Sequence, residues 1–197
     1  MIITNVFADA RDSIFDPLKI PKKIDNKNIK QVVIYIVVLS SFVFVLQYLF
    51  AILLNKTQLI TIKDIIILIF FNLFIWFSLS LFVMLPLTIF IRYHMSESEK
   101  NYFKSNPHNA MKWTNEQWRK NFKLMGYSIT PIIIFTPLSM VISTYIFYLS
   151  WYWIVLGTIG FSEAFKVSKV EAFVSLAIAY ILAIILFWQP FREVMMF

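Results

Sequence analysis

The sequence contains no cysteine, only three glycines and only two histidines among its 197 residues. The absence of cysteine excludes disulfide bonds, thiolate metal sites and lipidated cysteines. Charged residues are also scarce, at 15% of the chain, whereas 59% of residues are hydrophobic and the mean hydropathy is +0.72. A soluble domain has about 45–50% apolar residues. The composition therefore predicts an integral membrane protein.

The few charges are concentrated, so that four long stretches contain none: 31–55, 65–91, 124–162 and 172–191. Each is long enough for the run of about 20 apolar residues that a helix needs to cross a bilayer. As one helix, 124–162 would measure about 60 Å, twice the hydrocarbon thickness, so we divide it near Tyr148–Trp151. We predict an all-α membrane bundle of five transmembrane helices, the fourth of them short, at 31–54, 65–92, 123–147, 151–166 and 170–189.

Lysine and arginine are distributed unequally between the connecting segments. The tail 1–30 and the central loop 94–122 with its flanks carry most of them, and five alternating spans place 15 on one face and 3 on the other. Cytoplasmic segments are enriched in these residues, so we predict a cytoplasmic N-terminus and a C-terminal end, 191–197, outside. A four-span arrangement would place 13 lysine and arginine residues on one face and 5 on the other, and it remains an alternative.

The cytoplasmic tail is predicted to contain a short amphipathic helix lying on the membrane surface. Asp9, Arg11 and Asp12 lie off its apolar face, and Pro17 and Pro21 end the helix. A disordered tail is the alternative. The predicted apolar face is formed by residues at spacings of three and four: Ile3, Phe7, Ala10 and Ile14.

In the central loop, the stretch SESEKNYFKSNP is typical of turns. The spacing of Thr114 and Gln117 predicts a capping box and an interfacial helix that continues into the third span. An ordinary loop is the alternative. Tryptophans near predicted span ends are expected to be interfacial anchors at the headgroup level: Trp113, Trp118, Trp151, Trp153 and Trp188.

The third span, KLMGYSITPIIIFTPLSMVIS, contains a glycine and two prolines. A proline inside a helix costs about 3 kcal/mol in water, but membrane helices tolerate it where hydroxyls or neighbouring helices compensate the freed carbonyls. Thr130 precedes Pro131, and a second threonine precedes Pro137. We therefore expect a bent helix buried in the bundle, with Gly126 admitting a close neighbour.

Three polar residues of the predicted spans are candidates for a special role. Glu163 lies three residues before Lys166, so an ion pair is the favoured reading and a functional role the alternative. For Asn72 and Gln47 we expect interhelical hydrogen bonds.

Signals for catalysis are weak. His94, Glu97 and Glu99 do not have the spacing of helical metal ligands, and no nucleophile elbow, HExxH motif or phosphate loop is present. We expect no enzymatic site, no cofactor and no bound metal. The basic charge is explained by topology, so nucleic acid is not an expected partner.

Three stretches resemble the Yip family of Rab-interacting, five-span membrane proteins: GYSITP, SWYW and KVSKVEAF. The resemblance covers about 15–190 and is strongest over 123–187. The chain resembles the small prokaryotic-type members of that family, because it lacks the long cytoplasmic domain of eukaryotic members. The positions that carry the resemblance are Gly126, Tyr127 and Pro131. It implies a membrane-organising or adaptor role rather than catalysis.

Three functions remain open from the sequence. The first is a non-enzymatic scaffold that binds lipid and other membrane proteins, as a homo- or hetero-oligomer. The second is an accessory subunit of a larger membrane complex, and the third is a small transporter or channel. A transporter would be expected to show an internal repeat or a polar path.

Overall fold

The computed structural model describes residues 2–54, 61–142, 145 and 147–195, and within them every regular element is a helix, which confirms the all-α prediction. The elements are α1 (Ile2–Phe15), η1 (Pro17–Lys19), α2 (Ile20–Ile24), α3 (Ile29–Leu53), α4 (Ile62–His94), α5 (Glu97–Ser105), α6 (Pro107–Ser128), α7 (Thr130–Val141), α8 (Phe147–Ser150), α9 (Tyr152–Phe165) and α10 (Lys169–Met195).

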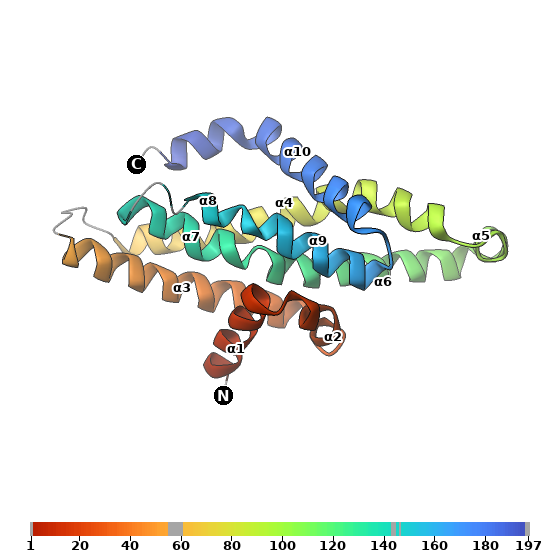
Figure 1. Ribbon diagram of the computed structural model, residues 1–197, viewed down its shortest axis with the longest axis horizontal. Helices are drawn as coiled ribbons and strands as arrows, with labels where there is room; N and C mark the ends of the chain where they lie inside the picture. Colours follow the sequence, from red (N-terminus) through yellow and green to blue (C-terminus); the bar gives the residue numbers. More distant parts are fainter. Residues whose placement is uncertain (1, 55–60, 143–144, 146, 196–197) are drawn as a thin grey trace.

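The long helices run back and forth along the long axis of the molecule (Figure 1). α3 and α4 form one antiparallel pair, and the short α5 turns the chain into α6 and α7 at one end. α9 returns to that end, where α10 begins and packs against α4 and α9. The N-terminal helices α1 and α2 lie outside this bundle, against α3 and α6.

Helix length gives partial support to the membrane prediction. Within the described residues, α3 and the part of α4 from Lys63 to His94 are long and apolar enough to cross a bilayer. α9 has 14 residues, or about 21 Å, which is shorter than the hydrocarbon core. α6 and α7 are interrupted at Ile129, the C-cap of one and the N-cap of the other. Within the described residues, length and apolar composition together therefore support two candidate crossings, and the count of five stays a prediction.

The central loop is helical, which corrects two predictions. The stretch expected to be turn-like forms α5, whose N-cap Ser96 accepts a hydrogen bond from the backbone of Glu99, while the Glu99 carboxylate accepts one from Ser96 N–H. Thr114 is not an N-cap: its hydroxyl donates to the Ala110 carbonyl at 2.9 Å inside α6, which has begun at Pro107. A proline at the first helical position favours that earlier start.

The ends of two predicted spans also need adjustment. α10 continues to Met195, beyond the expected end at 189, while residues 196–197 lie outside the described part. The third predicted span, 123–147, begins inside α6 and continues through α7, and residues 143, 144 and 146 lie outside the described part.

The outer surface of the long helices is apolar, and the interior contains polar residues among its apolar core. Large apolar side chains face outward along the two longest helices, at Phe42, Val45 and Leu49 of α3 and at Phe70, Phe74, Phe77, Leu85 and Ile89 of α4. The buried polar residues include Ser40, Asn72, Ser80, Asn121, Ser128, Thr130, Thr136, Ser139 and Ser175. Soluble proteins rarely expose apolar surface so continuously.

Candidate functional site

The break between α6 and α7 is compensated by a single side chain. Pro131 has no N–H, so the Tyr127 carbonyl four residues earlier loses its helical donor. The Thr130 hydroxyl donates to that carbonyl at an O···O distance of 2.5 Å. Thr130 and Pro131 are both buried. The third predicted span, expected to be bent, is interrupted at Ile129, and a hydroxyl of the kind expected to compensate the proline is present there.

A second hydrogen bond connects the same threonine to α3. Tyr35 Oη lies 2.7 Å from Thr130 Oγ1. Because the single Thr130 proton is directed at Tyr127, the Tyr35 hydroxyl is the donor. The rings of Tyr35 and Tyr127 also contact each other, with centroids 4.7 Å apart. We call Tyr35, Tyr127, Thr130 and Pro131 the tyrosine–threonine junction.

Gly126 permits the close approach of three helices next to this junction. A Cβ atom placed on it would lie 2.1 Å from Val32 Cγ1 of α3 and 3.3 Å from Trp76 Nε1 of α4. The Trp76 indole N–H in turn donates to the Phe122 carbonyl of α6 at 2.7 Å. The expectation that Gly126 admits a neighbouring helix is thus confirmed. Pro137 is also buried, within α7.

Two asparagines tie α4 to its neighbours. Asn72 Nδ2 donates to Ser40 Oγ of α3 at 2.9 Å, the interhelical hydrogen bond expected for it. Asn121 Nδ2, on α6, donates to the Ser80 carbonyl of α4 at 2.7 Å, and its Oδ1 is buried without a hydrogen-bond partner. Gln47 is half-buried on α3, and its expected hydrogen bond stays a prediction.

The remaining intramembrane candidate, Glu163, lies at the surface near the end of α9. Its carboxylate accepts a hydrogen bond from Lys166 Nζ at 3.1 Å, as the three-residue spacing predicts. Both side chains are largely exposed. The pair therefore lies at the end of the helix, and its charges are not buried.

The predicted tryptophan anchors divide into two groups. Trp151 is exposed, and Trp113 and Trp118 are half-buried, with Trp113 packed on Phe103. Trp153 is a core residue, only 2% exposed, so its side chain packs inside the bundle, and its expected interfacial depth stays a prediction. Its direction into the bundle depends on the turn between α8 and α9, which sequence position does not specify. The Trp188 side chain lies outside the described part.

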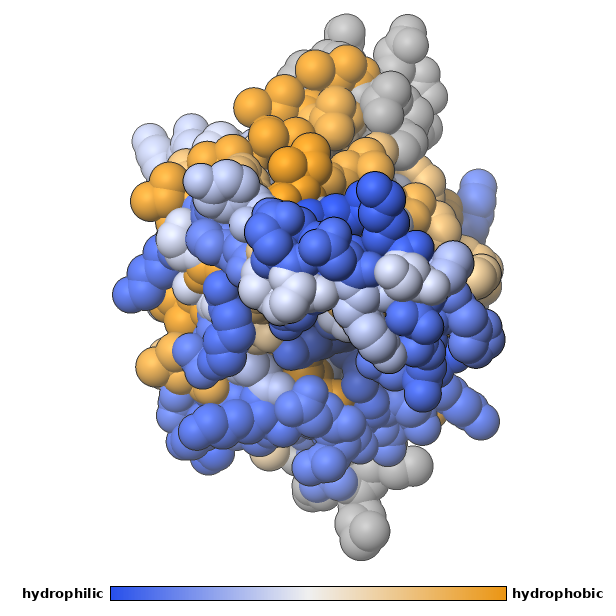
Figure 2. All heavy atoms as spheres, turned by 90° about the vertical axis from the view of Figure 1, so that its right-hand side faces the viewer, coloured by the Kyte–Doolittle hydropathy of each residue, from blue (hydrophilic) through white to orange (hydrophobic). Residues whose placement is uncertain are grey.

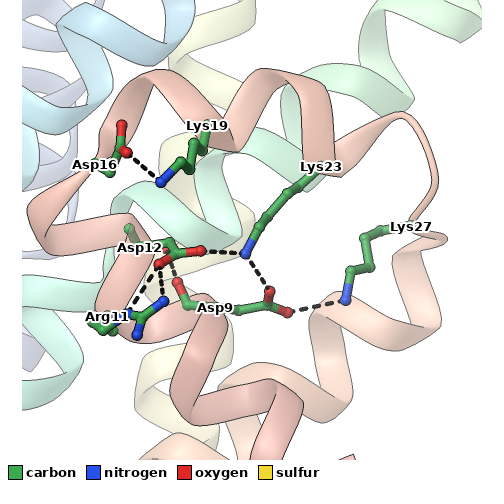
Figure 3. Close-up of polar contacts among 8 residues, drawn as sticks. Asp9, Arg11, Asp12, Asp16, Lys19, Lys23 and Lys27 are labelled. Carbon is green, nitrogen blue, oxygen red and sulfur yellow. Dashed lines mark hydrogen bonds and ion pairs between the residues drawn. The ribbon is translucent and has the colours of Figure 1, made fainter.

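A cluster of ion pairs holds the N-terminal segment together (Figure 3). Asp12 accepts hydrogen bonds from Lys23 Nζ at 2.5 Å and from Arg11 Nη2 at 2.9 Å. Asp9 binds Lys27 Nζ at 3.0 Å and Lys23 Nζ at 3.3 Å. Both carboxylates are 11% exposed. We call Asp9, Arg11, Asp12, Lys23 and Lys27 the N-terminal ion cluster.

This cluster corrects the prediction for α1. The helix is present and ends at Phe15, before Pro17. However, Asp9, Asp12 and Ser13 are buried, although the apolar spacing placed the aspartates off the packed face. The reason is that Lys23 and Lys27 fold back over α1 and provide charged partners. Phe7 does pack, on Phe42 of α3, while the side chain of Ile3 lies outside the described part.

Pairing shifts the titration of two members of the N-terminal ion cluster. Hydrogen bonds from Lys23 and then Arg11 hold the pKa of Asp12 below its ordinary value. Partial burial opposes the charge of Lys23, but its hydrogen bonds to Asp12 and Asp9 outweigh this and hold its pKa above the ordinary value. Each shift means that the folded arrangement favours the charged form.

We expect the docking of α1 to weaken at both extremes of pH. A lowered Asp12 pKa gives stabilisation that is present above the unfolded value of about 4 and lost as the pH falls through the folded pKa. A raised Lys23 pKa gives stabilisation that is present below about 10 and lost as the pH rises through the folded pKa. Hydrogen exchange of α1 amides, corrected for intrinsic rates, should therefore be slowest between about pH 4 and 10.

A matched pair of variants tests this assignment. Asp12→Asn should speed α1 exchange at neutral pH and flatten the acid side of the profile. Asp16→Asn removes the same charge from the exposed pair with Lys19 and should leave the profile unchanged. Equal profiles for the two variants would contradict the role assigned to Asp12.

The acidic and imidazole groups around His94 bind other partners than a shared metal. His94 Nε2 lies 2.9 Å from Glu171 Oε1 of α10, Glu97 pairs with Lys100, and Glu99 caps α5. The described residues contain no group of three histidine or acidic side chains arranged to hold a metal ion.

Sequence reasoning missed several of these residues. Tyr35 and Trp76 look like ordinary aromatic residues of apolar spans, and only the folded contacts reveal their hydrogen bonds. Asn121 lies just before a predicted span and was not singled out. The four-residue step from Thr130–Pro131 back to Tyr127 was a usable signal, since a freed carbonyl can be located from any proline.

No protein family, no curated protein and no solved structure matches the chain.

Proposed function

We propose that the protein is a non-enzymatic, five-span membrane scaffold or adaptor that holds other membrane proteins through its outer helix faces. The observation that carries this proposal is the continuous apolar outer surface of the two longest helices, together with polar side chains buried between helices. Apolar groups cover the outside of α3 and α4, while serines, threonines and asparagines are buried between helices. Lipid favours such a surface, and buried polar groups then connect the helices.

The use of the interior polar groups favours a structural role over transport. Asn72 bonds Ser40, Thr130 bonds Tyr35 and Tyr127, and Ser80, Ser128 and Ser139 each donate to a carbonyl of their own helix. Polar side chains that form hydrogen bonds within the bundle in this way do not line a path for a transported substrate. The resemblance to the Yip family agrees with this role. The three positions that carry the resemblance, Gly126, Tyr127 and Pro131, lie at or beside the tyrosine–threonine junction.

Two further observations support five crossings with a cytoplasmic N-terminus. The long helices alternate in direction along one axis (Figure 1). The end of the molecule formed by α5 and the start of α6 is densely covered by hydrophilic residues (Figure 2), and it includes the lysine-rich central segment. The short α9 then spans by joining α8, through a locally thinned part of the bilayer.

Membrane extraction and crosslinking together test this function. The protein should resist alkaline carbonate, be released by detergent, and form crosslinks to other membrane proteins through photoreactive residues placed at Phe42 or Phe74. The same probe at the buried Leu39 should give no intermolecular crosslink. Release by carbonate would contradict the membrane placement. Stoichiometric recovery in one large assembly would instead indicate the accessory-subunit function.

A further inference from the structure

A cleft of about 770 Å³ opens at the hydrophilic end of the molecule, between the end of α4, the α5–α6 hairpin and the end of α9. Figure 2 looks onto this end, where hydrophilic residues surround a hollow. The aromatic side chains that line the cleft include Phe103, Trp113 and Phe165. Its basic residues are His94, Lys120 and Lys166.

Lys120 differs from the other charged groups of the cleft. His94 faces Glu171, Lys166 pairs with Glu163, and Glu99 caps α5. Lys120 Nζ donates to the Ala164 carbonyl near the end of α9 and lies 5.5 Å from the Phe165 ring centroid. Within the described residues it forms no ion pair with a carboxylate.

The environment of Lys120 therefore favours an anion from outside the chain. Burial lowers the pKa of Lys120, Lys166 and Lys123 act in the same direction, and Asp25 partly opposes them. A bound anion would relieve this cost by adding a charge-assisted hydrogen bond. The ammonium has two further protons after the bond to Ala164.

The position of the cleft indicates the source of the anion. Given the membrane placement proposed above, on which this inference rests, Ile91, Lys120 and Phe165 lie at or near the inner ends of three spans. This is the depth of lipid headgroups, where aromatic side chains are favoured. Anionic lipids are attracted to basic groups on the cytoplasmic face.

We propose that the cleft binds the phosphate of an anionic lipid headgroup. Lys120 donates to a phosphate oxygen, and Lys166 adds a second, more exposed positive charge. Phe103 and Trp113 provide apolar contact for the glycerol and the first carbons of the chains. The ligand chemistry is thus a phosphate ester attached to an apolar body.

Short-chain lipids test this site on the purified, detergent-solubilised full chain. We expect dioctanoyl phosphatidic acid to bind about tenfold more tightly than dioctanoyl phosphatidylcholine in native mass spectrometry. Lys120→Met should remove about tenfold of that affinity, and Lys166→Gln about threefold. Arg119→Gln removes a charge from the neighbouring, exposed position and should change affinity by less than about twofold.

Each result of these binding experiments has a distinct interpretation. Tight binding of inorganic phosphate alone would identify free phosphate, not lipid, as the ligand. Equal losses in Lys120→Met and Arg119→Gln would overturn the site, because they would show only general surface attraction. Lys166→Gln keeps the test valid if Lys120→Met fails to fold, since Lys166 is exposed. Resistance to carbonate together with no lipid preference would overturn this inference and leave the proposed function intact.

Discussion

Replacing Gly126 with valine is expected to destabilise the folded protein by about 3 kcal/mol or more, the upper end of the cost of overpacking a core. The first added atom would lie 2.1 Å from Val32 Cγ1. Val32 is β-branched and fully buried, so its methyl group cannot rotate away freely. The helices α3 and α6 would have to separate. Unfolding in mixed detergent–SDS micelles, followed by circular dichroism, measures this loss.

Two companion variants isolate the cause. Val32→Ala in the Gly126→Ala background should recover part of the stability lost by Gly126→Ala alone, because it removes the methyl group that clashes. Gly160→Ala should cost less than about 1 kcal/mol, since its new atom meets only the terminal Leu124 Cδ1, at 3.2 Å, and alanine favours the helix. Stability of Gly126→Ala equal to wild type would show that the close approach is not required.

Replacing Thr130 with valine is expected to cost about 2 kcal/mol of folding free energy. The change keeps the shape of the side chain and removes the hydroxyl. The Tyr127 carbonyl, which lacks its regular helical donor because of Pro131, would lose the Thr130 hydroxyl, and the Tyr35 hydroxyl would lose Thr130 as its acceptor, both in a buried site. The same micelle unfolding experiment provides the measurement.

The control for this prediction keeps the hydroxyl. Thr130→Ser should cost less than about 1 kcal/mol, because serine can repeat both hydrogen bonds. The double variant Tyr35→Phe/Thr130→Val should cost less than the sum of its parts, since the two residues share one hydrogen bond. Equal effects of valine and serine at position 130 would contradict the hydrogen-bond account of the tyrosine–threonine junction.

Charge-free runs and helix breakers predicted much of the fold. The all-α class, the long helices over 29–53 and 62–94, the interruption near Pro131 and the close packing at Gly126 follow from hydropathy and from the special backbone chemistry of proline and glycine. The class, the helices and the interruption depend on residues near one another in sequence, so a single sequence contains the necessary information. At Gly126 the sequence predicts a close approach but not its partners, Val32 and Trp76.

Features that depend on distant contacts were predicted less well. The sequence shows Asp9 and Asp12 as the polar face of α1, but only the return of Lys23 and Lys27 makes that face buried. Trp153 is expected at the interface because tryptophan favours that depth, but its burial in the core depends on long-range contacts such as that with Tyr180. Serines in 94–106 resembled a turn, although Ser96 and Glu99 have the spacing of a capping box.

The number of membrane crossings is tested most directly by reporters fused at three positions. An alkaline phosphatase and a fluorescent reporter, active on opposite sides of the membrane, would be placed before Met1, at Asn106 and after Phe197. Five crossings predict cytoplasmic signals at Met1 and Asn106 and an external signal at Phe197. A cytoplasmic signal at both ends of the chain would contradict the five-span account.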